Sequence, residues 1–147
     1  MLVSNQEVKF TVHGEPVGKQ RPKFSRRGNH VHTYTPDKTM NYENLVRLEY
    51  SKQCGDFSFP KDTGIRMNIE AYFSIPKSAS RKKSALMLDK QIRPTKKPDS
   101  DNIIKIIADS LNGIAYHDDS QIVSCMFDKY YGSQACVTVS ICEADDS

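Results

Sequence analysis

Stripes of apolar residues divide this chain into a short series of strands and helices. Apolar and polar side chains alternate over Val8 to His13 and over Ile65 to Ile75, the period-two pattern of strands with one buried face. The runs from Gln121 to Tyr131 and from Gln134 to Cys142 are also strand-like. Gly132-Ser133 between these two runs predicts that they form a hairpin.

Three stretches predict helices. A helical stripe runs from a capping segment at Thr35-Pro36-Asp37-Lys38 to about Gln53. A short helix is expected over Ser80 to Leu88, and a third over Asp99 to Gly113. Together with the strands, they predict an α+β fold: one small domain, 1–147, in which helices pack on a mixed β-sheet of about four strands.

Two parts of the chain are expected to lack regular structure. The segment from about 14 to 33 is rich in Pro, Gly and basic residues and predicts a mobile loop, and the tail 143–147 is expected to fray. No window approaches the roughly 18 apolar residues of a membrane span. The N-terminus lacks the basic and apolar regions of a secretory signal, so we expect a cytoplasmic protein.

The third predicted helix concentrates chemically active side chains. On a helix that starts near Asp99, the side chains of Asp101, Lys105, Asp109 and Asn112 fall within about 80° of one another. The isoleucines of the same segment occupy the opposite arc. The helix is therefore expected to bury its isoleucines and to present its charges.

These acids have two interpretations. Neighbouring carboxylates raise each other's pKa unless a cation lies between them, so Asp99 and Asp101, with Asp118-Asp119 after the helix, form a candidate metal site. Alternatively, Asp99 or Asp101 could cap the helix, while Lys105 pairs with Asp101 and Asp109 on a solvated surface. The residues alone leave both interpretations open.

Basic residues gather in two blocks, although the net charge is only +3. An acidic site within an otherwise basic chain is the charge distribution expected of a metal nuclease, which must attract a polyanion. The candidate DNA-binding residues are Lys19, Arg21, Lys23, Arg26, Arg27, Arg81, Lys82, Lys83, Arg93, Lys96 and Lys97. A solvated charged surface is the alternative for both blocks.

The spacing of these acids resembles the RusA family of Holliday junction resolvases, small endonucleases of bacteria and their prophages. The matching residues are Asp99, Asp101, Asn102, Lys105, Asp109, Leu111, Asn112 and Gly113, then Asp118, Asp119, Gln121 and Ile122. Upstream, Gly18 to Pro22 and Tyr34 to Pro36 look like the N-terminal region of phage-type members.

The resemblance implies a homodimer that binds four-way DNA junctions and cuts two opposed strands symmetrically, in recombination and repair. The cofactor would be Mg²⁺, with Mn²⁺ as a substitute. The catalytic residues carried over from the family are Asp99, Asp101, Lys105 and Asp119. The three aspartates would hold the metal, Lys105 would stabilise the transition state, and Asp109 and Asp118 are assigned supporting roles.

Two other functions stay open. The chain could be a non-catalytic DNA-binding protein whose acids serve as caps, or a metal endonuclease that acts on other branched or duplex DNA. Paired nicks in a synthetic junction, formed only with Mg²⁺, would distinguish an enzyme from a binder. A comparison of substrates at equal concentration would distinguish a resolvase from the other endonucleases.

Overall fold

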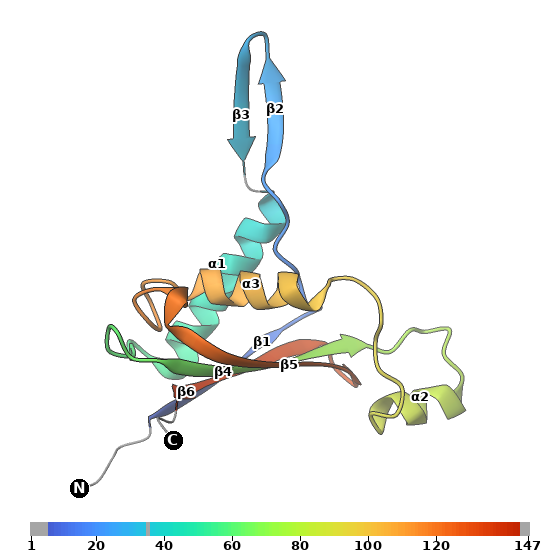
Figure 1. Ribbon diagram of the computed structural model, residues 1–147. Helices are drawn as coiled ribbons and strands as arrows, with labels where there is room; N and C mark the ends of the chain where they lie inside the picture. Colours follow the sequence, from blue (N-terminus) through green and yellow to red (C-terminus); the bar gives the residue numbers. More distant parts are fainter. Residues whose placement is uncertain (1–5, 35, 145–147) are drawn as a thin grey trace, which may run out of the picture.

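The computed structural model describes residues 6–34 and 36–144, except for the side chains of Lys23, Ser25, Arg27, His32 and Tyr34. Its centre is a mixed four-stranded sheet of order β1-β6-β4-β5 (Figure 1), which confirms the predicted fold class. The strands are β1 (Glu7–His13), β4 (Ile65–Ser74), β5 (Ile122–Gly132) and β6 (Cys136–Glu143). Strand β6 is antiparallel to both β1 and β4, while β4 and β5 are parallel.

The predicted hairpin between the last two strands is wrong, because β4 lies between β5 and β6. Residues 133–135 therefore carry the chain over the end of β4, across two strand spacings of about 4.8 Å each. A turn signal predicts where the chain reverses, but it does not say which strand becomes the neighbour. Strand β4 takes the central place because its alternate residues Ile65, Met67, Ile69, Ala71 and Phe73 are all buried.

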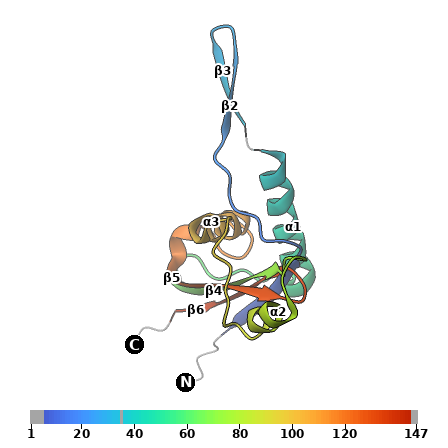
Figure 2. The ribbon, with the colours of Figure 1, turned by 90° about the vertical axis from the view of Figure 1, so that its right-hand side faces the viewer.

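Two helices pack on the face of the sheet that these side chains form. Helix α1 (Asp37–Cys54) contributes Tyr42, Val46 and Tyr50 to the core, and α3 (Ser100–Ser110) contributes its isoleucines. Helix α2 (Arg81–Leu88) begins at Ser80, whose hydroxyl accepts a hydrogen bond from the Lys83 N–H, and lies apart from the other two (Figure 2). The predicted helices are confirmed, although α3 ends at Ser110 rather than at Gly113.

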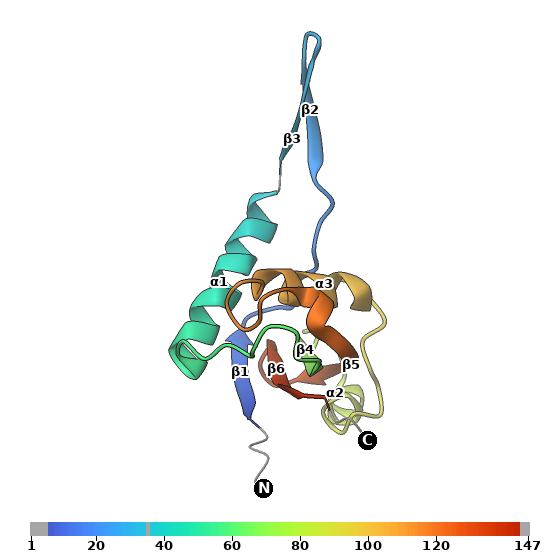
Figure 3. The same ribbon diagram turned by 60° about the vertical axis from the view of Figure 1, so that its left-hand side comes forward.

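The predicted mobile loop 14–33 contains a β-hairpin instead. Strands β2 (Lys23–Arg27) and β3 (His30–Tyr34) pair only with each other and project far from the sheet, as Figures 1 and 3 show. We call this projection the arm. Its turn is Gly28-Asn29, where Gly28 has a φ of 60°. Such two-residue turns are a hairpin signal, which the surrounding prolines and basic residues obscured.

The C-terminal prediction is also partly wrong. Glu143 is the last residue of β6, and the N–H of Ala144 donates a hydrogen bond of 2.9 Å to the carbonyl of Gly64. These two residues are therefore ordered by the sheet, and 145–147 lie outside the described residues. Thr35 of the predicted capping segment lies outside them too, and Pro36 precedes α1 without a side-chain cap. No helix of the described residues is both long and apolar enough to cross a membrane.

Candidate active site

Helix α3 carries Lys105 and Asp109, two side chains of the site. Its inner side buries Ile103, Ile106 and Ile107 completely, which confirms the predicted division of its two faces. On the outer side, the Lys105 ammonium lies 3.4 Å from the Asp109 carboxylate, one helical turn away. Burial of the isoleucines thus fixes the direction in which Lys105 and Asp109 point.

A short 3₁₀ turn (Asp119–Gln121) brings Asp119 to the same face. The buried side chain of Gln121 fastens this turn: its oxygen accepts hydrogen bonds from the N–H groups of His117 and Asp118. Its amide donates to the carbonyls of Pro60 and Thr63, each at 3.0 Å. Gln121 therefore ties the turn to the loop before β4 and positions the acids.

The carboxyl group of Asp119 lies beside that of Asp109, near enough for Asp109 to affect the pKa of Asp119. Burial, together with the negative charges of Asp109 and Asp118 and a hydrogen bond with Asp109, raises the pKa of Asp119, and Lys105 opposes this shift. By contrast, the pKa of Asp118 is lowered by hydrogen bonds from Ser120. Lys105 offsets part of the repulsion between the two carboxyl groups, and a metal cation between them would offset more of it. The donor set therefore fits a hard divalent metal ion.

The segment before the arm lies along the start of α3. The N–H of Lys19 donates to the carbonyl of Asn102 at 2.8 Å. A Cβ atom on Gly18 would come within 2.8 Å of the Pro98 Cβ, so this close approach needs glycine. The Lys19 ammonium lies 2.8 Å from Glu43 of α1 and 3.5 Å from Asp109 of α3.

The surroundings of Lys19 stabilise the charged form of its side chain. Burial lowers its pKa, but the hydrogen bonds and charges of Glu43 and Asp109 outweigh this effect, so the pKa of Lys19 lies above its usual value. The ammonium is predicted as a DNA contact, yet it is already paired with two acids. Lys19 is therefore part of the acidic site rather than a free surface charge.

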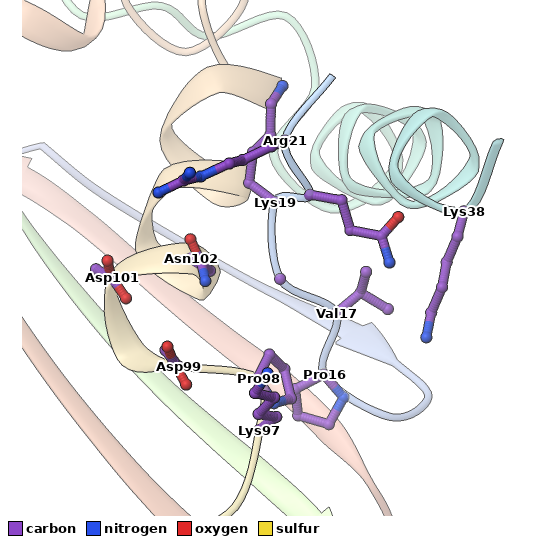
Figure 4. Close-up of a pocket in the computed structure, with 12 residues that line it drawn as sticks. Pro16, Val17, Lys19, Arg21, Lys38, Lys97, Pro98, Asp99, Asp101 and Asn102 are labelled. Carbon is purple, nitrogen blue, oxygen red and sulfur yellow. The ribbon is translucent and has the colours of Figure 1, made fainter. Parts of the chain in front are cut away.

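Asp99 and Asp101 lie beside a pocket of about 620 Å³, between the segment before the arm and the start of α3 (Figure 4). The pocket is lined by Pro16, Val17, Gly18, Lys19, Gln20, Arg21, Lys38, Lys97, Pro98, Asp99, Asp101 and Asn102. In Figure 4 the Arg21 side chain extends toward the helix turn that carries Asp101 and Asn102. The pocket thus joins acidic groups with basic ones.

The three predicted metal ligands do not converge. Asp99 and Asp101 lie at the start of α3, whereas Asp119 lies beside Asp109, which is about 12 Å further along the helix axis than Asp101. Within the described part of the chain, no three acidic, histidine or cysteine side chains are grouped closely enough to hold a metal ion. The structure therefore presents an extended acidic face, with Lys105 between its two ends.

The basic residues differ in how free their charges are. Arg93 is not a free charge, because it binds Asp128 at 2.7 Å and the carbonyl of Lys129 at 2.8 Å. Lys96 lies over the ring of Phe73. The exposed residues of the set are Arg21, Arg26, Arg81, Lys82, Lys83, Arg93, Lys96 and Lys97. The side chains of Lys23 and Arg27 lie outside the described residues.

Sequence reasoning missed the roles of two residues. Glu43 lies on a helix that was predicted only as a core element, and nothing in its neighbourhood marks it as part of a site. Gln121 belongs to the matched pattern, but no role was assigned to it. The signal for Gln121 is its position three residues after Asp118, since it closes a capping box on the turn.

The fold and this set of side chains define a small α+β protein with an acidic, lysine-flanked site. The chain belongs to the RusA family: the family model for Endodeoxyribonuclease RusA matches residues 13–142. The chain is also similar to "Uncharacterized protein YqaN" of Bacillus subtilis (strain 168), with 38% identity over 139 residues, which cover 92% of this chain and 96% of the relative. The family is thus one of DNA-cleaving hydrolases, and its nucleases depend on metal in general.

Proposed function

We propose that this chain resolves four-way DNA junctions by symmetric, Mg²⁺-dependent hydrolysis, in recombination and repair. The observation that supports this proposal most directly is the position of Asp119 beside Asp109, whose carboxylate lies 3.4 Å from the Lys105 ammonium. Carboxyl groups that repel one another cost stability, so their placement side by side favours a functional role. Membership of the RusA family supports the substrate class.

Asp99, Asp101 and Asp119 would hold the metal, for which Mn²⁺ could substitute. Mg²⁺ needs only one or two protein carboxylates, because water and substrate phosphate complete its shell. A metal bound here lowers the pKa of a water molecule and neutralises charge on the scissile phosphate. Because these acids lie at the two ends of the acidic face, binding of metal and DNA would have to draw them together.

Lys105 would act on the substrate directly. Its side chain is 61% exposed and, among the described residues, pairs with Asp109, so it can reach a phosphate near the helix. There its ammonium group would stabilise the negative charge that develops in the transition state. Asp109 and Asp118 would support the site, Asp109 by orienting Lys105 and Asp118 by capping the turn that carries Asp119.

The arm and the surface of α2 are proposed to bind the DNA duplexes that meet at the junction. Lys19 is paired with Glu43 and Asp109, but the arm and the segment before it carry four other basic residues, Arg21, Lys23, Arg26 and Arg27. The pairing of Phe24 with Thr33 and of Arg26 with Val31 puts these four residues on one face of the ribbon. Phe24 is 73% exposed there, as a wedge between bases would have to be.

A dimer is proposed because two coordinated cuts on a nearly symmetric substrate need two sites. Sedimentation of the protein at low micromolar concentration, with and without junction DNA, would test this point. A monomer in the presence of bound junction would contradict it.

The decisive experiment is cleavage of synthetic junctions by the parental protein and by Asp101→Asn. The parental protein should give paired nicks with Mg²⁺, whereas Asp101→Asn should cut slower by orders of magnitude. Junction binding should survive, since loss of a negative charge does not weaken attraction to phosphate. Equal cleavage by both proteins would refute the metal assignment. In electrophoresis, a shifted junction band without nicks would indicate a DNA-binding protein. Equal cutting of flaps or duplex DNA would indicate a different endonuclease.

A further inference from the structure

Glu43 is a buried carboxylate outside the set of acids discussed for catalysis. Its side chain is 11% exposed and belongs to the middle of α1 rather than to α3 or the turn. A charge in such a place must be paired, and its ion-pair partner among the described residues is Lys19. The pair therefore has a definite geometry, with the ammonium fixed on the side of α3.

Lys19 links three parts of the molecule. Its ammonium contacts Glu43 of α1 and Asp109 of α3, and its backbone N–H binds the carbonyl of Asn102 at the start of α3. The next N–H, of Gln20, donates to the hydroxyl of Thr39 on α1 at 3.4 Å. Both the backbone and the side chain of Lys19 therefore bind neighbouring groups, and helices α1 and α3 together determine its position.

Asp109 receives two ammonium groups, from Lys19 at 3.5 Å and from Lys105 at 3.4 Å. If Lys105 moved to a substrate phosphate, Asp109 would remain paired, because Glu43 keeps Lys19 in place. Without that second ammonium, departure of Lys105 would leave a partly buried carboxylate unpaired, which is costly. The two lysines are therefore not equivalent: one neutralises Asp109 while the other is available to the substrate.

From this geometry we propose that Glu43 is a positioning residue of the nuclease site, which holds Lys19 on Asp109 so that Lys105 can leave Asp109 for the scissile phosphate. The proposal rests on the proposed nuclease function. It assigns Lys19 to the organisation of the site rather than to DNA affinity. Glu43 is expected to affect the rate of cleavage and not the binding of DNA.

The kinetic test is a double-mutant cycle of Glu43→Gln and Lys19→Met, measured as single-turnover cleavage with saturating protein. Glu43→Gln should slow cleavage about 10- to 100-fold, while the Kd for the junction stays the same. In the Lys19→Met background, Glu43→Gln should have no further effect, since it acts through Lys19. The matched control is Glu49→Gln on the same helix, whose carboxylate pairs with Lys52 at 3.3 Å. This control should cleave at the parental rate.

Parental cleavage by Glu43→Gln, or equal slowing by this change with and without Lys19, would overturn the proposal. A spectroscopic measurement separates it from the nuclease function: NMR of lysine ammonium groups in the protein without metal or DNA. The signal of the hydrogen-bonded Lys19 ammonium should be lost or shifted in Glu43→Gln and retained in Glu49→Gln. An unchanged signal in Glu43→Gln would overturn the proposal. A parental protein that cuts no DNA would instead refute the proposed function, and the NMR result would still show whether Glu43 holds Lys19.

Discussion

Replacement of Gln121 by Met should loosen the turn that presents Asp119. The two side chains have similar length, but Met retains neither the acceptor nor the donors of the amide. The change removes four hydrogen bonds, two from backbone N–H groups of the turn and two to the carbonyls of Pro60 and Thr63. The backbone partners are left to find water at a position where the Gln121 side chain is buried.

The size of the effect follows from these four bonds. With a net contribution of about 0.5–1 kcal/mol for each, the free energy of unfolding should fall by about 2–4 kcal/mol. For a chain of this length, that loss corresponds to a decrease in Tm of roughly 5–15 °C. Urea unfolding followed by circular dichroism would measure the free energy, and junction cleavage should also slow because Asp119 is less well positioned.

Gln134→Met is the matched control, because Gln134 is an exposed residue of the connection between β5 and β6. Its effect on the free energy of unfolding should stay within about 0.5 kcal/mol. If Gln121→Met were as stable as this control, the bonds of Gln121 would not hold the turn. If it lost stability but cleaved at the parental rate, the position of Asp119 would not matter for the reaction.

Two further predictions concern charge. Because burial and neighbouring acids raise the pKa of Asp119, the folded protein binds this proton more tightly than the unfolded chain, so its stability falls as the pH rises from about 4 through the folded pKa. In the absence of metal, Asp119→Asn should therefore raise the Tm above that range and flatten its pH dependence; Mg²⁺ should raise the Tm of the parental protein more than that of the variant. An unchanged pH profile would contradict the assigned repulsion. On the arm, Arg26→Ala should reduce the salt dependence of junction binding, measured as the slope of log K against log[salt], by about one, whereas Arg66→Ala on β4 should leave it unchanged. Equal slopes for both variants would exclude a phosphate contact by Arg26.

Local patterns in the sequence determined most of the elements. The alternation over Ile65 to Ile75 predicted β4 within one residue, because a strand buried on one face must alternate. The stripe of isoleucines similarly predicted the buried side of α3 and, with it, the direction of Lys105 and Asp109. Such predictions succeed because each depends only on residues within a few positions of one another.

Only the tertiary structure decided how distant segments meet. The insertion of β4 between β5 and β6 depends on burial across the whole sheet. The residues of the turn between β5 and β6 do not indicate it. The contact of Lys19 with Glu43, 24 positions later, and with Asp109 depends on how α1 and α3 pack on that sheet. The sequence by itself thus determined which side chains could form an acidic site. The packing of helices and strands decided which of them touch, because contacts between distant residues arise only from the fold as a whole.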